Sequence, residues 1–123
     1  MKNFAERYTA AWCSNNPSSV AEFFALDGSL KVNDSPPAIG RTEITAVAQG
    51  FMTAFPDLQV FMDDLILDPA GPIYHWTLTG TYSETGKPVR ISGYEVWKIS
   101  DDGLIAVSLG NFDQADYQRQ IAT

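Results

Sequence analysis

Reactive sulfur and imidazole groups are scarce in this chain of 123 residues, which has one cysteine, Cys13, and one histidine, His75. A single cysteine cannot form an intramolecular disulfide, and this is typical of a reducing compartment, so we expect a cytoplasmic location. No cluster of cysteine and histidine is available to hold zinc. The Asp101-Asp102-Gly103 segment has the pattern of a hairpin turn rather than of a calcium loop. We therefore expect no metal site.

Basic residues are also few, with 8 Lys and Arg against 15 Asp and Glu and a net charge of −7. They are scattered along the chain and form no patch that would bind phosphates, which argues against a nucleic-acid partner. No apolar run reaches the length that spans a bilayer, and the charges within MKNFAERYTAAW argue against a signal peptide. We therefore expect no membrane partner either.

The common catalytic and cofactor motifs are missing as well. The chain has no glycine-rich phosphate loop, no Gly-x-Ser-x-Gly nucleophile elbow, no Cys-His pairing and no nucleotide-binding fingerprint. Covalent catalysis and a bound cofactor are therefore not expected. If the protein is an enzyme, its chemistry should be cofactor-independent proton transfer on a bound, mostly apolar carbonyl compound.

The composition is globular, with 45% hydrophobic and 19% charged residues, and its size suits one domain over residues 1–123. The first half of the chain has helical patterns. Apolar spacing and flanking residues predict helices over residues 3–13, from 18 or 19 to 26, and from about 41 to 55. Asp27-Gly28 predicts a turn of the chain, and residues 29–33 are predicted to form a short strand.

After Asp57 the pattern changes to strands. Segments 58–67, 73–82, 89–100 and 104–112 alternate with turn sequences rich in Asp, Gly and Pro. Helices followed by a meander of strands predict the α+β class, with the N-terminal helices packed on one curved, mostly antiparallel sheet. We expect these layers to form a cone with an opening, and residues 114–121 to form a last short helix.

The segment His75–Ile99 is the most informative part of the chain. Its two predicted strands carry aromatic or branched apolar residues at both parities, so neither face has the composition of a solvated surface. The pattern predicts a sheet that is covered on one side and hollow or partnered on the other. Glu95 lies in the more apolar part of this segment, where a carboxylate needs either a partner or a function.

The order of several short segments along nearly the whole chain resembles the SnoaL-like polyketide cyclases, a family of the nuclear transport factor 2 and ketosteroid isomerase superfamily. These segments are an early helix with Tyr8 and Trp12, then FFALDGSLKVN, PPAIGRTEI, AFPDLQV, HWTLTGT, RISGYEVWKISDDGLI and GNFDQADYQRQI. The resemblance implies a cone-shaped pocket and a homodimer through the other face of the sheet. It names no reaction, because the fold hosts cyclases, isomerases, dehydratases, hydrolases and non-catalytic binders.

The resemblance also implies positions for catalytic residues. In the cyclases an acidic residue or histidine lies on the last strand, and that place falls near Ser108, which cannot act as a base at neutral pH without help. In the ketosteroid isomerases a tyrosine of the first helix and an acid of the penultimate strand form the oxyanion hole; Tyr8 and Glu95 fall at similar places. The isomerase base lies on the first strand, where this chain offers Val32, then Asn33 and Asp34.

Each catalytic candidate has a second interpretation. Glu95 either donates a hydrogen bond to a ligand oxygen or is a structural carboxylate paired with Arg41, Arg90 or a tyrosine hydroxyl. Tyr8 either donates into the pocket or only packs on the helix face. Asp34 is either a base at the pocket mouth or ordinary turn chemistry beside Ser-Pro-Pro.

Other residues are expected to line the pocket or bind a polar ligand group: Trp12, Trp97, Ser108, Phe112 and Asn111. Asp113 is expected to tie down the C-terminal tail. The function indicated is a small-molecule pocket protein with an apolar ligand and acid/base catalysis on a polyketide- or steroid-like carbonyl compound. The alternative is a non-catalytic ligand-binding or accessory protein on the same fold. A pure adaptor domain would have a filled cone.

Overall fold

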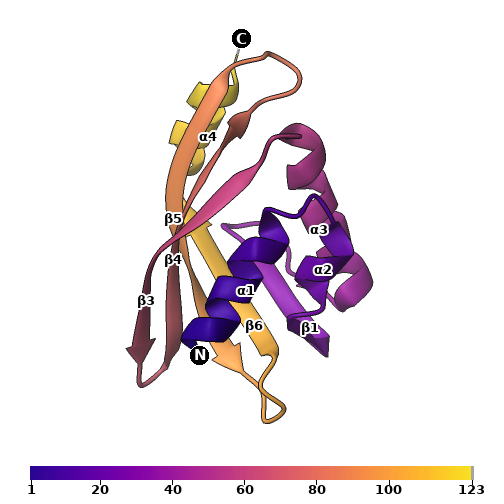
Figure 1. Ribbon diagram of the computed structural model, residues 1–123, viewed down its shortest axis with the longest axis vertical. Helices are drawn as coiled ribbons and strands as arrows, with labels where there is room; N and C mark the ends of the chain where they lie inside the picture. The colour runs from indigo at the N-terminus through magenta and orange to yellow at the C-terminus, as the bar shows by residue number, and fades with distance from the viewer. Residues whose placement is uncertain (123) are drawn as a thin grey trace.

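The computed structural model describes residues 1–122, which contain four helices and six strands. The strands form one curved sheet, and the helices pack against it (Figure 1). No helix in this range is long and apolar enough to cross a membrane. The predicted α+β class is confirmed. The elements are α1 (Lys2–Trp12), α2 (Pro17–Ala21), β1 (Phe24–Val32), β2 (Ala38–Ile39), α3 (Arg41–Ala54), β3 (Gln59–Asp68), β4 (Gly71–Thr81), β5 (Pro88–Ile99), β6 (Ile105–Phe112) and α4 (Gln114–Ile121).

The sheet has the strand order β2-β1-β6-β5-β4-β3. Strands β3 to β6 form the predicted antiparallel meander, but β1 runs parallel to β6. This pairing joins segments that are far apart in the sequence, and it places Leu30 beside Ser108 and Val32 beside Gly110. The late strand β6 therefore lies between the early strand β1 and β5.

Two predicted boundaries are wrong. The second helix ends at Ala21 rather than at residue 26, and β1 begins at Phe24 rather than at residue 29. Asp27-Gly28 does not turn the chain but lies inside β1, where the register with β6 shifts. A Cβ at Gly28 would lie 2.8 Å from the Ile105 carbonyl oxygen, so a residue without a side chain lets this irregular part of β1 close against β6.

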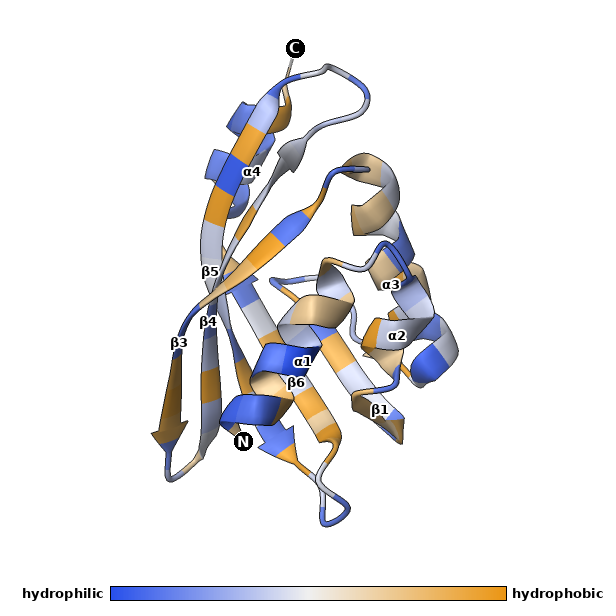
Figure 2. Cartoon of the chain, viewed as in Figure 1, coloured by the Kyte–Doolittle hydropathy of each residue, from blue (hydrophilic) through white to orange (hydrophobic). Residues whose placement is uncertain are grey.

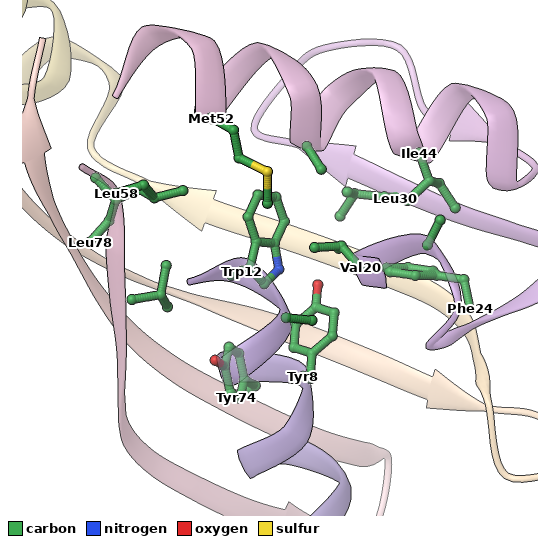
Figure 3. Packing of buried hydrophobic residues seen from close by; sticks show 14 of the residues in the cluster. Tyr8, Trp12, Val20, Phe24, Leu30, Ile44, Met52, Leu58, Tyr74 and Leu78 are labelled. Atoms are coloured by element: carbon green, nitrogen blue, oxygen red, sulfur yellow. The ribbon is translucent and has the colours of Figure 1, made fainter. Parts of the chain in front are cut away.

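Helix α1 packs its apolar face onto the sheet because Ala5, Tyr8, Ala11 and Trp12 follow the helical period. The Tyr8 ring meets the Trp97 ring edge-on at a centroid distance of 5.3 Å. In Figure 3, Met52 of α3 points toward the Trp12 ring, with Tyr8 beside it on α1. Burial of each large side chain here contributes about 1.5–3 kcal/mol to stability, so this seam between helices and sheet carries much of the fold.

Helix α4 is mostly hydrophilic (Figure 2) and begins at the predicted tail anchor. The Asp113 carboxylate accepts a hydrogen bond from the Asp116 backbone N–H at 3.0 Å, which caps the helix. The Gln120 side chain accepts from the Arg90 backbone N–H at 2.8 Å and donates to the Arg90 carbonyl at 2.9 Å. This side chain thus pairs with the edge of β5 beyond the point where β6 ends.

The face of the sheet turned away from α1, which we call the outer face, carries a continuous apolar row. The register aligns its members across four neighbouring strands: Ile66, Ile73, Val96 and Leu109. Ile66 is 44% exposed and Leu109 is 45% exposed. The next row on this face is polar and includes His75 and Asn111. The outer face is therefore not a uniformly solvated surface.

Candidate functional site

The inner face of the sheet, against α1, brings one carboxylate next to several hydroxyl and indole groups. Alternation along β5 places Glu95 and Trp97 on this face. In the register, Glu95 lies between Tyr74 of β4 and Gly110 of β6, and Trp97 lies opposite Ser108. Glu95 is buried, with 8% of its surface exposed.

Three donors from three different elements converge on one oxygen of Glu95. The Tyr8 hydroxyl of α1 donates to Oε1 at 2.9 Å, the Trp97 indole Nε1–H at 3.0 Å, and the Ser108 hydroxyl of β6 at 2.7 Å. All three donor residues are buried, with at most 1% exposed surface. A carboxylate oxygen with three donors is held in a fixed orientation.

The other oxygen, Oε2, has no hydrogen-bond partner among residues 1–122. The only fully buried side-chain nitrogen or oxygen without a partner in this range is Nε1 of Trp76. Oε2 is therefore not fully buried, and Glu95 is one of the residues that line a cavity. The carboxyl group is bound to the protein on one side and open on the other.

Burial raises the pKa of Glu95 above its usual range, and the three hydrogen bonds oppose this shift only in part. No basic side chain compensates, since the only ion pair within residues 1–122 joins Arg119 to Asp116 at 3.1 Å. Arg41 instead donates to the Phe24 carbonyl at 2.9 Å. Of the two interpretations of Glu95 as a structural group, the pairing with an arginine is thus wrong, and the pairing with a tyrosine hydroxyl is present.

The aromatic groups around this carboxyl support one another. The Tyr74 ring stacks on the Trp97 ring at a centroid distance of 5.0 Å, and the Tyr74 hydroxyl shares a 2.5 Å hydrogen bond with Thr9. Burial and the nearby Glu95 raise the pKa of Tyr8 well above its ordinary value, so its hydroxyl stays protonated and donates. The donor set is therefore constant over the pH range in which Glu95 titrates.

Glu95 opens onto an apolar cavity of about 60 Å³ between the helices and the sheet. Pockets for drug-sized ligands typically measure about 300–1,000 Å³, so this cavity as it stands suits a ligand of few heavy atoms. Bulky aromatic side chains from both layers fill the rest of the cone. The lining residues are Trp12, Leu30, Val32, Val47, Phe51, Val60, Tyr74, Trp76, Leu78, Ile91, Glu95, Gly110 and Phe112.

Two features of the cavity wall concern its polarity and shape. The Trp76 indole N–H is buried without an acceptor, which is unusual in a well-packed protein. Gly110 leaves space beside the carboxylate, since a Cβ there would lie 3.8 Å from Cγ of Glu95. Apart from Glu95, no lining residue has a charged side chain at neutral pH.

The structure brings together six of the predicted site residues. Trp12, Phe112 and Glu95 line the cavity, whereas Tyr8, Trp97 and Ser108 lie behind Glu95 and reach it only through Oε1. Ser108 thus occupies the position expected for a cyclase acid, but here it serves a carboxylate on the neighbouring strand.

The other two predicted site residues lie elsewhere. Asp34 is exposed in the turn after β1 and is not among the residues that line the cavity, so its position does not support a role as base. Asn111 lies on the outer face next to Tyr94, and its amide donates to the Leu109 carbonyl at 3.3 Å. Alternation along β6 explains this, because Gly110 and Phe112 take the inner positions.

Several residues of the site were not predicted. Tyr74 and Gly110 flank Glu95 only because of the strand register, which a single sequence does not reveal. Val47 lies on α3, where the apolar spacing of the predicted helix indicated burial but not a cavity wall. Within residues 1–122 no group of three or more His, Cys, Asp or Glu side chains is arranged to hold a metal ion.

Comparison with known proteins identifies the family. A family model described as the SnoaL-like domain matches residues 5–108. No curated protein matches the sequence. The chain belongs to the SnoaL-like family, as the resemblance implied.

Solved structures share the fold at low sequence identity. A protein with a ketosteroid isomerase-like fold from Catenulispora acidiphila, in complex with trimethylamine, is 14% identical with a TM-score of 0.86, covering 95% of this chain and 90% of that one. An NTF2-like protein of unknown function from Burkholderia pseudomallei is 17% identical with a TM-score of 0.86, covering 99% and 97%. A candidate SnoaL-like polyketide cyclase from Jannaschia is 14% identical with a TM-score of 0.81, covering 98% and 92%. These likenesses confirm the cone-shaped fold.

Proposed function

We propose that this member of the SnoaL-like family binds a small, mostly apolar carbonyl compound in its cavity and exchanges a proton with it through Glu95. The observation that carries the proposal is a single carboxyl group that faces an apolar cavity with one free oxygen. A raised pKa brings the carboxyl closer to neutral pH, where an acid/base group is present in both protonation states.

In the proposed reaction, the ionised Glu95 takes a proton from the carbon next to the ligand carbonyl, and an enolate forms. The protonated carboxyl then returns the proton to the same or to a conjugated carbon, so that no other reactant is consumed. With a cavity of about 60 Å³, a polyketide- or steroid-like compound would insert one end only.

The test measures exchange of α-protons for deuterium by NMR in D₂O, with acetone, cyclohexanone and 2-tetralone as enolisable ketones of increasing size. We expect the wild-type protein to accelerate exchange of at least one ketone on the order of 100-fold over Glu95→Gln. Ser92→Ala, a hydroxyl deletion on the opposite face of β5, is the matched control and should exchange like wild type. Equal rates for wild type and Glu95→Gln with all three ketones would contradict the proposal.

A second candidate function is binding without chemistry, with a small alkylammonium ion as ligand. Aromatic walls and one carboxylate are the groups that recognise such cations, and the similar Catenulispora protein was solved with trimethylamine. Titration with trimethylammonium chloride by calorimetry tests this. A cation should bind more tightly as the pH rises and Glu95 ionises, and Glu95→Gln should abolish that pH dependence.

We further propose that the protein is a homodimer formed through the outer face. The apolar row of Ile66, Ile73, Val96 and Leu109 would otherwise stay in contact with water, and monomeric proteins rarely leave contiguous apolar patches exposed. A second copy is the occupant that an extended, self-complementary row fits. Sedimentation at micromolar concentration that shows only monomer would refute this.

We also infer that residues 1–123 form one domain and that the protein works in the cytoplasm. The family model covers residues 5–108, and α4 is tied to β5 through Gln120 and Arg90. The single cysteine, Cys13, is engaged with the Val60 backbone rather than placed for a disulfide. Limited proteolysis and fractionation of the source cells test the two statements separately.

A further inference from the structure

We propose that Tyr8, Trp97 and Ser108 are positioning residues that fix the Glu95 carboxyl through Oε1, so that Oε2 is the one oxygen that exchanges a proton with a ligand. This inference rests on the proposed function for its chemical meaning. The positioning itself is a property of the ligand-free protein and can be measured without any ligand.

The geometry is specific because the backbone alone would not place the carboxyl in this way. Glu95 lies opposite Gly110 in the register, yet its carboxyl bends toward the next row, where Trp97 pairs with Ser108. Gly110, the residue of β6 directly opposite Glu95, has no side chain of its own to contact the Glu95 side chain. The carboxyl is thus directed by its three donors.

The donors are themselves held in place. The Trp97 indole is stacked on Tyr74 and meets the rings of Phe4 and Tyr8 edge-on at 5.8 and 5.3 Å. Tyr8 and Ser108 have no exposed surface. Because all three donors come from packed elements, their loss of conformational freedom was already incurred on folding, and the carboxyl needs no reorganisation when a ligand arrives.

A purely structural carboxylate would be expected to use both of its oxygens, since an unpartnered polar atom next to an apolar cavity is costly. Here all donors are on Oε1, and Oε2 has none within residues 1–122. The two oxygens of the carboxyl group therefore have different roles. Oε1 is bound to the protein, and Oε2 remains for the ligand.

The test is a titration of the Glu95 carboxyl carbon by ¹³C NMR in the ligand-free protein, for wild type and for Ser108→Ala, Tyr8→Phe and Trp97→Phe. Each variant removes one donor to the charged form, so the proton affinity of Glu95 should rise on the order of tenfold. Ser108→Thr keeps a hydroxyl and should restore a titration close to that of wild type. Ser92→Ala, whose hydroxyl pairs with Thr77 on the other face, is the matched control and should titrate like wild type.

The outcomes separate this inference from the proposed function. If the donor variants titrate like Ser92→Ala, the positioning role is overturned, whatever the protein does. If their titration shifts and the pH profile of ketone α-proton exchange shifts in parallel, both ideas are supported. If the titration shifts but no variant and not even wild type exchanges ketone protons, the positioning role stands and the catalytic proposal fails. Ser108→Ala only removes a small group, so it keeps the test valid if Tyr8→Phe or Trp97→Phe folds poorly.

Discussion

The two faces of the sheet differ in which kind of side chain lies in an unfavourable environment. On the inner face a carboxylate, Glu95, is buried among aromatic rings, whereas on the outer face apolar side chains such as Leu109 are left exposed. Neighbouring residues of the same strands create both situations, since Val96 of β5 belongs to the outer row and follows Glu95 directly. A buried polar group and an exposed apolar group each gain free energy from a partner. The comparison indicates a ligand for one face and a second copy of the chain for the other.

The largest expected effect comes from removing the carboxyl on the inner face. In Glu95→Ala the three buried donors from Tyr8, Trp97 and Ser108 lose their acceptor, so the free energy of unfolding should fall by about 3 kcal/mol or more. Glu95→Gln keeps an acceptor oxygen for them and should fold normally. Urea unfolding of both variants measures the difference, and equal stabilities would show that the donors do not depend on Glu95.

On the outer face, Leu109→Glu places a charge at the β6 end of the apolar row. We expect the dimer dissociation constant to rise more than tenfold, while Glu95 still titrates as in wild type. Leu67→Glu is the matched control, because Leu67 is 68% exposed but follows Ile66 and so lies outside the row. Sedimentation over a range of concentrations measures both variants. An intact dimer in Leu109→Glu, or a dissociated one in Leu67→Glu, would place the interface elsewhere.

The difference in stability between wild type and Glu95→Gln should change with pH, and this change reports on the inner face alone. Burial raises the pKa of Glu95 in the folded protein above its unfolded value, so the native state holds this proton more tightly. Below the unfolded pKa, wild type and Glu95→Gln should therefore be similar in stability. As the pH rises through the folded pKa, wild type should lose stability relative to Glu95→Gln, by about 1.4 kcal/mol for each unit by which the two pKa values differ. Melting temperatures that diverge in the opposite direction would contradict the burial of the charge.

The smallest expected effect concerns the size of the cavity. Gly110→Ala adds a methyl group 3.8 Å from Cγ of Glu95 and 3.2 Å from the Lys31 carbonyl oxygen, so it should cost about 1 kcal/mol of stability. Any ketone exchange should then shift in favour of acetone over 2-tetralone. Gly50→Ala, where nothing lies within 4 Å, is the control; it should stabilise α3 by about 1 kcal/mol and leave ligand size preference unchanged. If Gly110→Ala leaves the ligand size preference unchanged, the ligand does not bind beside Glu95.

The sequence predicted the helices α1, α3 and α4 and the meander well, because each depends on local period and turn chemistry. It did not predict that β1 extends from Phe24 or pairs in parallel with β6, since neither depends on neighbouring residues. Pairing between distant segments is decided by tertiary packing, and the Asp27-Gly28 turn signal was overridden by it.

For the site, the sequence indicated Tyr8 and Glu95 through the family resemblance, and the structure brings them into contact at 2.9 Å. The same reasoning placed Ser108 where the cyclases have an acid or a histidine and expected it to bind ligand, but its role as a donor to Glu95 required the register of β5 and β6. Asp34 and Asn111 were chosen as site residues because of their residue types alone. Their side chains lie outside the cavity because exposure and strand parity are properties of the fold.

The parallel contact between β1 and β6 sets an order of events for a chain emerging from a ribosome. Residues 24–32 are synthesised long before residues 105–112, so one edge of β1 stays unpaired while most of the protein is made. Closing so long a loop is entropically costly, and pairing between distant segments slows folding. Ser108 lies on the same late strand, so Glu95 receives this donor only when β6 has been made and has paired with β5. A nascent chain that stops before β6 therefore lacks the Ser108 hydroxyl, and its Glu95 carboxyl has only the donors from Tyr8 and Trp97.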